Sequence, residues 1–174
     1  MPDSAWIERE AIAHDIDGAR AIEQLVDSDL IAISAGRNVV VAYPFSGSQT
    51  AHRIEPEAGP PLYAMCAIDA LGIPFMLERD ARVLSHDVRS GERIRVVFSG
   101  GKARFESAET VVFVGARGEG GSVADRCCGS INFFSSEQSA RAYREAEPAL
   151  RGVVLAHDDA LDLGKRVFGN LLRD

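Results

Sequence analysis

Cys66 and Asp69 are the residues of this chain whose types and spacing are best suited to chemistry. They lie three positions apart in the apolar stretch YAMCAIDALGIPFML, residues 63–77. In a helix, positions i and i+3 share one face, so we expect the thiol and the carboxylate to lie close together. A carboxylate buried there must find a partner or keep its proton. The pair therefore combines a soft nucleophile with a proton carrier.

A purely structural role is the competing interpretation for both residues. A lone cysteine in an apolar helix is usually inert, because free cysteine packs like a small hydrophobic residue. Asp69 would be structural if it capped the helix or paired with Arg79 or Arg82, but a position in mid-helix argues against a cap. Packing alone does not require a carboxylate in this stretch, which favours the chemical interpretation.

Cys127 and Cys128 are the other two thiols of the chain, in the segment CCGSINFF (residues 127–134), which we predict to be a buried strand. Adjacent strand residues point to opposite faces, so at most one of these thiols should face a given site. Two buried structural cysteines remain an equal alternative. Without a CxxC motif a structural zinc site is disfavoured. Two thiolates and a carboxylate would instead suit a soft, thiophilic ion.

The four histidines add little to this set. His14 and His157 lie near predicted helix ends, and His52 lies in a polar stretch. All three are expected to be surface residues rather than ligands.

The composition of the chain excludes several classes of function. Its 174 residues, 46% of them hydrophobic, can form one sizeable core. The net charge of −7 disfavours binding to nucleic acid. An apolar run of membrane-spanning length is absent from the sequence, and the acidic N-terminus is unlike a signal peptide. We therefore expect a cytoplasmic protein whose three cysteines are reduced thiols.

Residues 1–55 are predicted to form a small helix-plus-hairpin unit. Apolar residues at helical spacing precede Leu30, and a turn at Arg37-Asn38 separates two strand-like segments, IAISA and VVVAY. This order is partly winged-helix-like, but it lacks a basic recognition surface, so a structural or oligomerisation role is favoured. Prolines and glycine in the segment 55–61 predict a linker.

Residues 56–174 are predicted to form the catalytic domain, with α+β architecture built on a mixed or antiparallel sheet flanked by helices. Gly72 and Pro74 should end the helix that contains Cys66. Ser136 and Asp158 are expected to cap the two last helices. Predicted strands cover residues 81–85, 93–98 and 110–114. The glycine-rich segment 115–122 is expected to be a loop, since it lacks the spacing of a phosphate-binding motif.

Three segments in the same order resemble the alkylmercury lyases, also called organomercurial lyases. YAMCAIDAL followed by Pro74 is similar to the catalytic helix of that family. ARVLSHDVRSGERIRV (residues 81–96) is similar to the strand–turn–strand that follows it, and RCCGSINFFSSEQSA (residues 126–140) resembles the second cysteine motif. The resemblance covers residues 54–172, and three colinear motifs are far more specific than one.

The resemblance implies that Cys66, Asp69 and Cys127 are catalytic. It implies that a thiolate attacks the mercury of an organomercurial, the second thiol joins, and the aspartate relays a proton to the carbon. Hg²⁺ would be held transiently by these three residues, with Cys128 as a further candidate ligand, and then pass to cellular thiols or a mercuric reductase. The implied substrate is a small organomercurial, the other product is a hydrocarbon, and no organic cofactor, nucleic acid or membrane is implied.

The chain departs from the family pattern at several positions. Met65 replaces a usual tryptophan, His86-Asp87 stands where a further cysteine is frequent, and Gly129 and Asn132 replace frequent histidines. The N-terminal region is also expected to be shorter. These departures leave two alternatives open: a protein that binds or senses a soft metal without catalysis, and a relative that acts on another carbon–heteroatom bond. A DNA-binding regulator is a third, distant alternative.

Overall fold

The structure, a computed structural model, describes residues 2–118 and 127–172. Its chain divides into two compact units, Met1–Ser48 and Gln49–Asp174. Among the described residues, every helix is too short or too polar to cross a membrane.

The predicted linker lies inside the second unit rather than between the two units. Glu55 and Pro56 belong to strand β4 (Arg53–Pro56), and the residues after them lead to strand β5 (Leu62–Tyr63). Gly59, Pro60 and Pro61 therefore belong to the connection between two paired strands.

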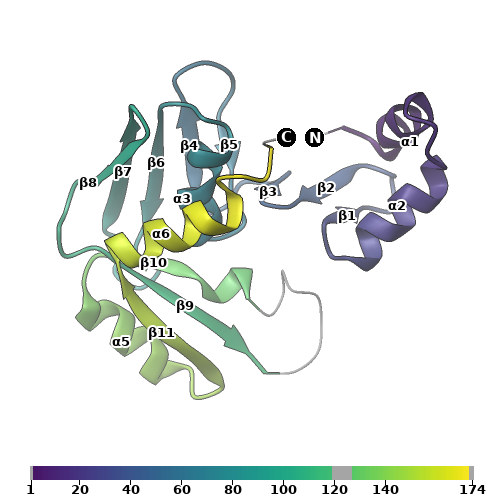
Figure 1. The fold of residues 1–174 in the computed structure, drawn as a ribbon. Helices are drawn as coiled ribbons and strands as arrows, with labels where there is room; N and C mark the ends of the chain where they lie inside the picture. The colour runs from purple at the N-terminus through teal and green to yellow at the C-terminus, as the bar shows by residue number, and fades with distance from the viewer. Residues whose placement is uncertain (1, 119–126, 173–174) are drawn as a thin grey trace. The chain divides into compact units, whose positions relative to one another are not determined.

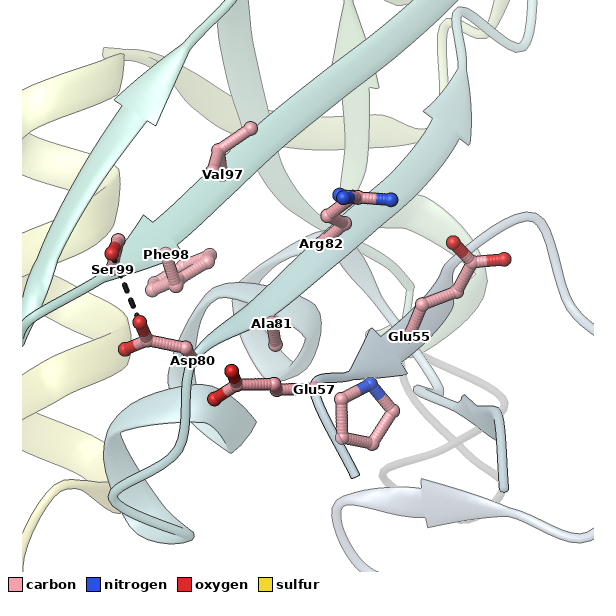
Figure 2. A pocket seen from close by; sticks show the side chains of 9 residues that line it. Glu55, Glu57, Asp80, Ala81, Arg82, Val97, Phe98 and Ser99 are labelled. Atoms are coloured by element: carbon pink, nitrogen blue, oxygen red, sulfur yellow. Dashed lines mark hydrogen bonds between the residues drawn. The ribbon is translucent and has the colours of Figure 1, made fainter. Parts of the chain in front are cut away.

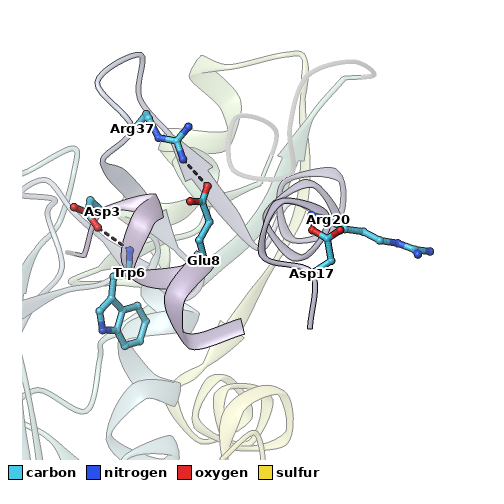
Figure 3. Close-up of polar contacts among 6 residues, drawn as sticks. All are labelled: Asp3, Trp6, Glu8, Asp17, Arg20 and Arg37. Carbon is cyan, nitrogen blue, oxygen red and sulfur yellow. Dashed lines mark hydrogen bonds and ion pairs between the residues drawn. The ribbon is translucent and has the colours of Figure 1, made fainter. Parts of the chain in front are cut away.

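Two helices begin the first unit, and each starts at an aspartate (Figure 3). The Asp3 carboxylate accepts a hydrogen bond from the Trp6 N–H at the start of α1 (Ser4–Ala13). Asp17 accepts one from the Arg20 N–H at the start of α2. Such caps each stabilise a helix by about 1 kcal/mol, because they satisfy backbone donors that the helix leaves unpaired. The second helix, α2, spans Gly18–Asp27.

A three-stranded antiparallel sheet follows, in the order β1-β2-β3. Its strands are β1 (Ile31–Ile33), β2 (Val39–Ala42) and β3 (Phe45–Ser46). The predicted helix and hairpin are thus confirmed, with Arg37 at positive φ in the turn. An ion pair joins Arg37 to Glu8 of α1 (Figure 3). The winged-helix likeness stays a prediction.

Two antiparallel sheets form the second unit (Figure 1). The larger sheet has the order β5-β4-β6-β7-β8, and the smaller has the order β10-β9-β11. The strands not yet placed are β6 (Ala81–His86), β7 (Arg93–Ser99), β8 (Lys102–Phe105), β9 (Val111–Arg117), β10 (Asn132–Phe134) and β11 (Leu150–Ala156). Helix α3 contacts β4 and β6 of the larger sheet, and α5 contacts all three strands of the smaller sheet. The predicted α+β class is confirmed.

The helices of this unit are α3 (Ala67–Met76), α5 (Glu137–Ala146) and α6 (His157–Phe168), with a short 3₁₀ helix, η1 (Cys128–Ser130), before β10. Ser136 caps α5 as predicted, its side chain accepting from the Ser139 N–H. Asp158 does not cap α6. The N-cap is Ala156, the helix begins at His157, and Asp158 lies in its first turn.

Helix α3 is longer than its glycine and proline predict. It continues through Gly72 and Pro74 and ends at Met76. Proline costs a helix one backbone hydrogen bond, but nine of the ten residues of α3 are buried, and this packing outweighs the local preference. Gly72 lies where α3 crosses α6, so its small size serves close packing rather than termination.

We expect the substitution Gly72→Ala to destabilise the protein by about 1–3 kcal/mol, the usual cost of overpacking. A Cβ at this position would lie 2.2 Å from Phe168 Cδ2 and 2.9 Å from the Gly164 carbonyl oxygen. Urea denaturation measures the change in the free energy of unfolding. Gly129→Ala is the control, because its Cβ would meet only Arg117 Nη1, at 4.0 Å. Equal stability of both variants would contradict close packing at the helix crossing.

The segment 127–134 differs from its prediction in its first half. Cys127 precedes η1 and Cys128 begins it, and the strand starts only at Asn132. The two cysteines therefore do not alternate across a strand. Of the predicted glycine loop, Gly115–Arg117 extend β9, and residues 119–122 lie outside the described residues.

Candidate active site

Cys66 is the N-cap of α3, not a residue of its interior. Its backbone is extended, and its Sγ accepts a hydrogen bond from the Asp69 N–H at 3.5 Å. Asp69 is the third residue of the helix and is fully buried. The spacing of three residues thus brings the thiol and the carboxylate together, through a cap rather than a shared helical face. The positive end of the helix dipole favours negative charge at this position.

A backbone hydrogen bond joins the other cysteine segment to the start of α3. The Ala67 N–H donates to the Ile131 carbonyl at 3.1 Å. Since Ile131 directly follows η1, this bond holds the turn that contains Cys128 against the N-terminus of the helix.

Cys66, Asp69 and Cys128 form a compact group of possible metal ligands. One ligand atom from each residue lies within 4.8 Å of the others. Their exposed fractions are 2%, 0% and 6%, so the group is almost closed to solvent. Cys127, assigned a catalytic role by resemblance, is half-buried and does not belong to this group. The structure thus places the residue named only as a possible ligand beside Cys66.

The two thiols of the group differ in acidity. Burial raises the pKa of Cys66 well above its usual value, and its hydrogen bond to Cys128 and the negative charge of Asp69 raise it further. The Asp69 N–H opposes this, but burial is the larger effect. The hydrogen bond from Cys66 lowers the pKa of Cys128 despite the cost of burying that thiol. Cys128 therefore ionises first, and the Cys66 S–H donates to it.

Comparison with known proteins shows to which family this chain belongs. The sequence profile of the family described as alkylmercury lyase matches residues 45–169. The chain belongs to the alkylmercury lyase family. The matched residues include both cysteine segments and Asp69, so the family pattern covers the whole group of ligands.

Individual relatives support the same assignment. An alkylmercury lyase of Staphylococcus epidermidis is 30% identical over 129 residues, which are 74% of this chain and 58% of the relative. One from Pseudomonas putida is 30% identical over 127 residues, 72% of this chain and 58% of the relative. The chain thus spans about half the length of the curated relatives it matches.

A solved structure described as the mercury-bound form of MerB2 is also similar to this chain. It aligns with a TM-score of 0.73 and 26% identity, over 86% of this chain and 73% of the other. The α+β fold described above is therefore similar to that of a family member with mercury bound.

In this member of the alkylmercury lyase family, His52 is buried, which the sequence does not reveal. It was predicted to lie on the surface, but only 2% of it is exposed. Its Nδ1 lies 3.0 Å from Ser85 Oγ, and its ring packs edge-on against Phe133. Burial and the nearby His86 lower the pKa of His52 to about 4, so the ring is neutral at pH 7. Its neighbours in the sequence are polar and therefore predicted an exposed position. Its burial results from tertiary packing.

Asp87 is a second buried polar residue, and it joins two parts of the fold. One carboxylate oxygen accepts from the N–H groups of Arg89 and Ser90, and the other accepts from the N–H and hydroxyl of Ser135. Burial raises the pKa of Asp87, but these hydrogen bonds and one from Ser139 outweigh it and lower the pKa to about 2. The carboxylate holds the turn after β6 to the end of β10, close in sequence to the second cysteine segment.

We expect Asp87→Asn to reduce the free energy of unfolding by about 2 kcal/mol at pH 7, since hydrogen bonds to a charged group contribute about 1.5–3 kcal/mol. The pKa of Asp87 is lower in the folded state than in the unfolded chain. Its contribution is therefore complete above the ordinary aspartate pKa and is lost as the pH falls through about 2. Urea titrations of both proteins from pH 7 to pH 2 measure this, and a constant difference over that range would contradict it.

A cavity of about 400 Å³ lies elsewhere, against β4, β6 and β7 (Figure 2). Its described lining contains carboxylates and an arginine but no thiol. Asp80 accepts hydrogen bonds there from the Ser99 hydroxyl and the Gly100 N–H, both at 2.9 Å, which explains this carboxylate as part of a turn. Oxygen ligands suit hard ions, so this cavity does not fit a soft metal.

Proposed function

We propose that this chain cleaves the carbon–mercury bond of organomercurials by protonolysis, giving a hydrocarbon and Hg²⁺. The observation that carries the proposal is the buried group of two thiols and one carboxylate, with ligand atoms within 4.8 Å of one another. Thiolates bind a soft metal tightly, and a carboxylic acid is suited to transfer a proton. The family profile, which covers residues 45–169, supports the same reaction.

The reaction begins with capture of the substrate, R–Hg⁺, by a thiolate. Cys128 is the first nucleophile in this scheme, because its pKa is lowered while Cys66 keeps its proton. As the second sulfur binds mercury, Cys66 loses its proton to the neighbouring Asp69 carboxylate. Two sulfurs within 4.8 Å can share one ion, since a metal–thiolate bond is about 2.3 Å long for zinc.

Protonation of the carbon completes the reaction. Asp69 gives its proton to the carbon, the electrons of the carbon–mercury bond form the new C–H bond, and the hydrocarbon leaves. In sum, R–Hg⁺ and two thiols give R–H, a mercury dithiolate and one proton. The burial of all three residues favours this step, because it keeps water from the thiolates and the acid.

The geometry of the site and the family resemblance indicate different cysteines as the second thiol. The family pattern assigns this role to Cys127, whereas Cys128 lies beside Cys66 and Asp69. We propose Cys66, Cys128 and Asp69 as the reacting residues. Cys127, adjacent and half-buried, then lies where it can receive or deliver mercury.

The scheme uses only groups of the protein, so we propose that no organic cofactor takes part. The dithiolate-bound Hg²⁺ must leave by exchange with other thiols, which small cellular thiols or a mercuric reductase would supply. Free thiols persist in a reducing compartment, and a cytoplasmic location fits this requirement.

Phenylmercuric acetate is the substrate for a direct test. The reduced protein is expected to release benzene, measured by gas chromatography, repeatedly when excess small thiol is present. A matched concentration of that thiol alone is the control. Mercury retained by the protein without benzene above this control would overturn the proposal and indicate metal binding without catalysis.

A further inference from the structure

Residues 50–64 tie His52 to the segment that leads into Cys66. The Ala64 N–H donates to the His52 carbonyl at 3.0 Å. The Thr50 hydroxyl accepts from the His52 N–H and donates to the Ala64 carbonyl at 2.6 Å. Since Ala64 lies two residues before Cys66, the backbone of His52 is fixed to the first cysteine segment.

The ring of His52 reaches the second cysteine segment. Its Nδ1 lies against the Ser85 hydroxyl, and the ring also makes a hydrogen bond to the Asn132 side chain. Because Nδ1 faces Ser85, we assign the bond to Asn132 to the other ring nitrogen. The Asn132 amide in turn donates to the Gly129 carbonyl at 3.3 Å. Gly129 belongs to η1, directly after Cys128. A chain of hydrogen bonds thus runs from His52 to the turn that holds the second thiol.

The two side chains in this chain of hydrogen bonds, His52 and Asn132, are buried and uncharged. His52 and Asn132 are almost fully covered, and Asn132 occupies the first position of β10. Buried polar groups are retained only where they are hydrogen-bonded, and such networks fix geometry.

We propose that His52 is a positioning residue that, through Asn132, holds the Cys128 turn at the distance from Cys66 needed for both sulfurs to bind one ion. Its importance for catalysis rests on the proposed lyase function. The spacing of the two sulfurs does not depend on that function, so the binding of a dithiol probe tests the inference separately.

Two amide substitutions separate the two hydrogen bonds of the ring. The amide of His52→Gln reaches the position of the distal ring nitrogen and keeps the Asn132 contact. The shorter amide of His52→Asn reaches only the position of Nδ1 and keeps the Ser85 contact. The inference predicts that glutamine preserves the dithiol and asparagine does not.

Phenylarsine oxide, which binds two neighbouring thiols at once, is the probe. All proteins carry Cys127→Ser, so that Cys66 and Cys128 are the dithiol measured. His52→Asn is expected to weaken binding about tenfold, the equivalent of one hydrogen bond, and His52→Gln to change it less than about threefold. Asn132→Ala should match His52→Asn. Calorimetric titration gives the affinities.

Val96→Ala controls for loss of stability, since Val96 is a buried residue of β7 with an apolar side chain. Wild-type affinity in both His52→Asn and Asn132→Ala would overturn the inference. So would equal losses in His52→Gln, His52→Asn and Val96→Ala, because they would indicate a merely structural role. If the wild type binds the probe but releases no benzene, the lyase proposal is wrong. The measured affinities of the variants still test whether His52 positions the dithiol.

Discussion

Cys128→Ser is expected to reduce benzene release from phenylmercuric acetate at least about thousandfold, as the loss of one member of a catalytic unit typically does. Cys127→Ser is expected to keep it within about fivefold, because that residue lies outside the catalytic unit. Only Cys128 places its sulfur within 4.8 Å of both Cys66 and Asp69 among the described cysteines. A serine hydroxyl keeps the size of the side chain but binds mercury poorly, so the pair of variants isolates the sulfur.

The experiment measures initial rates under excess small thiol, together with the number of Hg²⁺ ions that each variant retains against a competing thiol. Cys66→Ser is the positive control for loss of the dithiol. The opposite order, with Cys127→Ser inactive and Cys128→Ser active, would show that the residue indicated by the family pattern is the second thiol.

The first half of the site follows from local sequence. An apolar stretch with a thiol and a carboxylate three residues apart has few good structural explanations, and the structure brings Cys66 and Asp69 together. The detail differs, because Cys66 caps the helix instead of lying within it. Residues i and i+3 lie close together both when residue i caps the helix and when both residues share a helical face. The expected proximity of Cys66 and Asp69 is therefore the same in either arrangement.

The second half of the site does not follow from local sequence. The segment 127–134 is apolar enough to predict a strand throughout, but its first residues form a 3₁₀ turn. That turn is joined to α3 by the Ala67–Ile131 bond, between residues 64 positions apart. Local pattern does not contain such a contact, so which cysteine faces Asp69 could not be deduced from alternation.

Two strands of the larger sheet, β6 and β7, were predicted, because β-branched residues alternate with polar ones in both. Strands β4, β5 and β8 of the same sheet were not predicted. Gly91, Gly100 and Gly101 have positive φ in the turns that follow β6 and β7. Strand β11 was not predicted either. Most of its residues are exposed or half-buried and Gly152 interrupts it, yet it pairs with β9 along its whole length.

Asp69→Asn is expected to slow the release of benzene strongly while leaving Hg²⁺ bound to the dithiol with an affinity within about threefold of wild type. The amide has the shape of the carboxylate, but it does not accept the Cys66 proton or deliver one to carbon. General acid catalysis alone contributes about 10²–10⁴-fold to a rate. A loss of at least about a hundredfold is therefore expected, measured as benzene under single-turnover conditions, where product Hg²⁺ does not limit the rate.

Asp87→Asn is the matched control, because it makes the same substitution at a second buried carboxylate that has no contact with mercury in the proposed scheme. It should retain turnover when assayed below its unfolding temperature. Full activity of Asp69→Asn would exclude this carboxylate as the proton donor. Loss of Hg²⁺ binding in a folded Asp69→Asn protein would instead make Asp69 a necessary ligand, because the two thiols alone would then be insufficient to hold the ion.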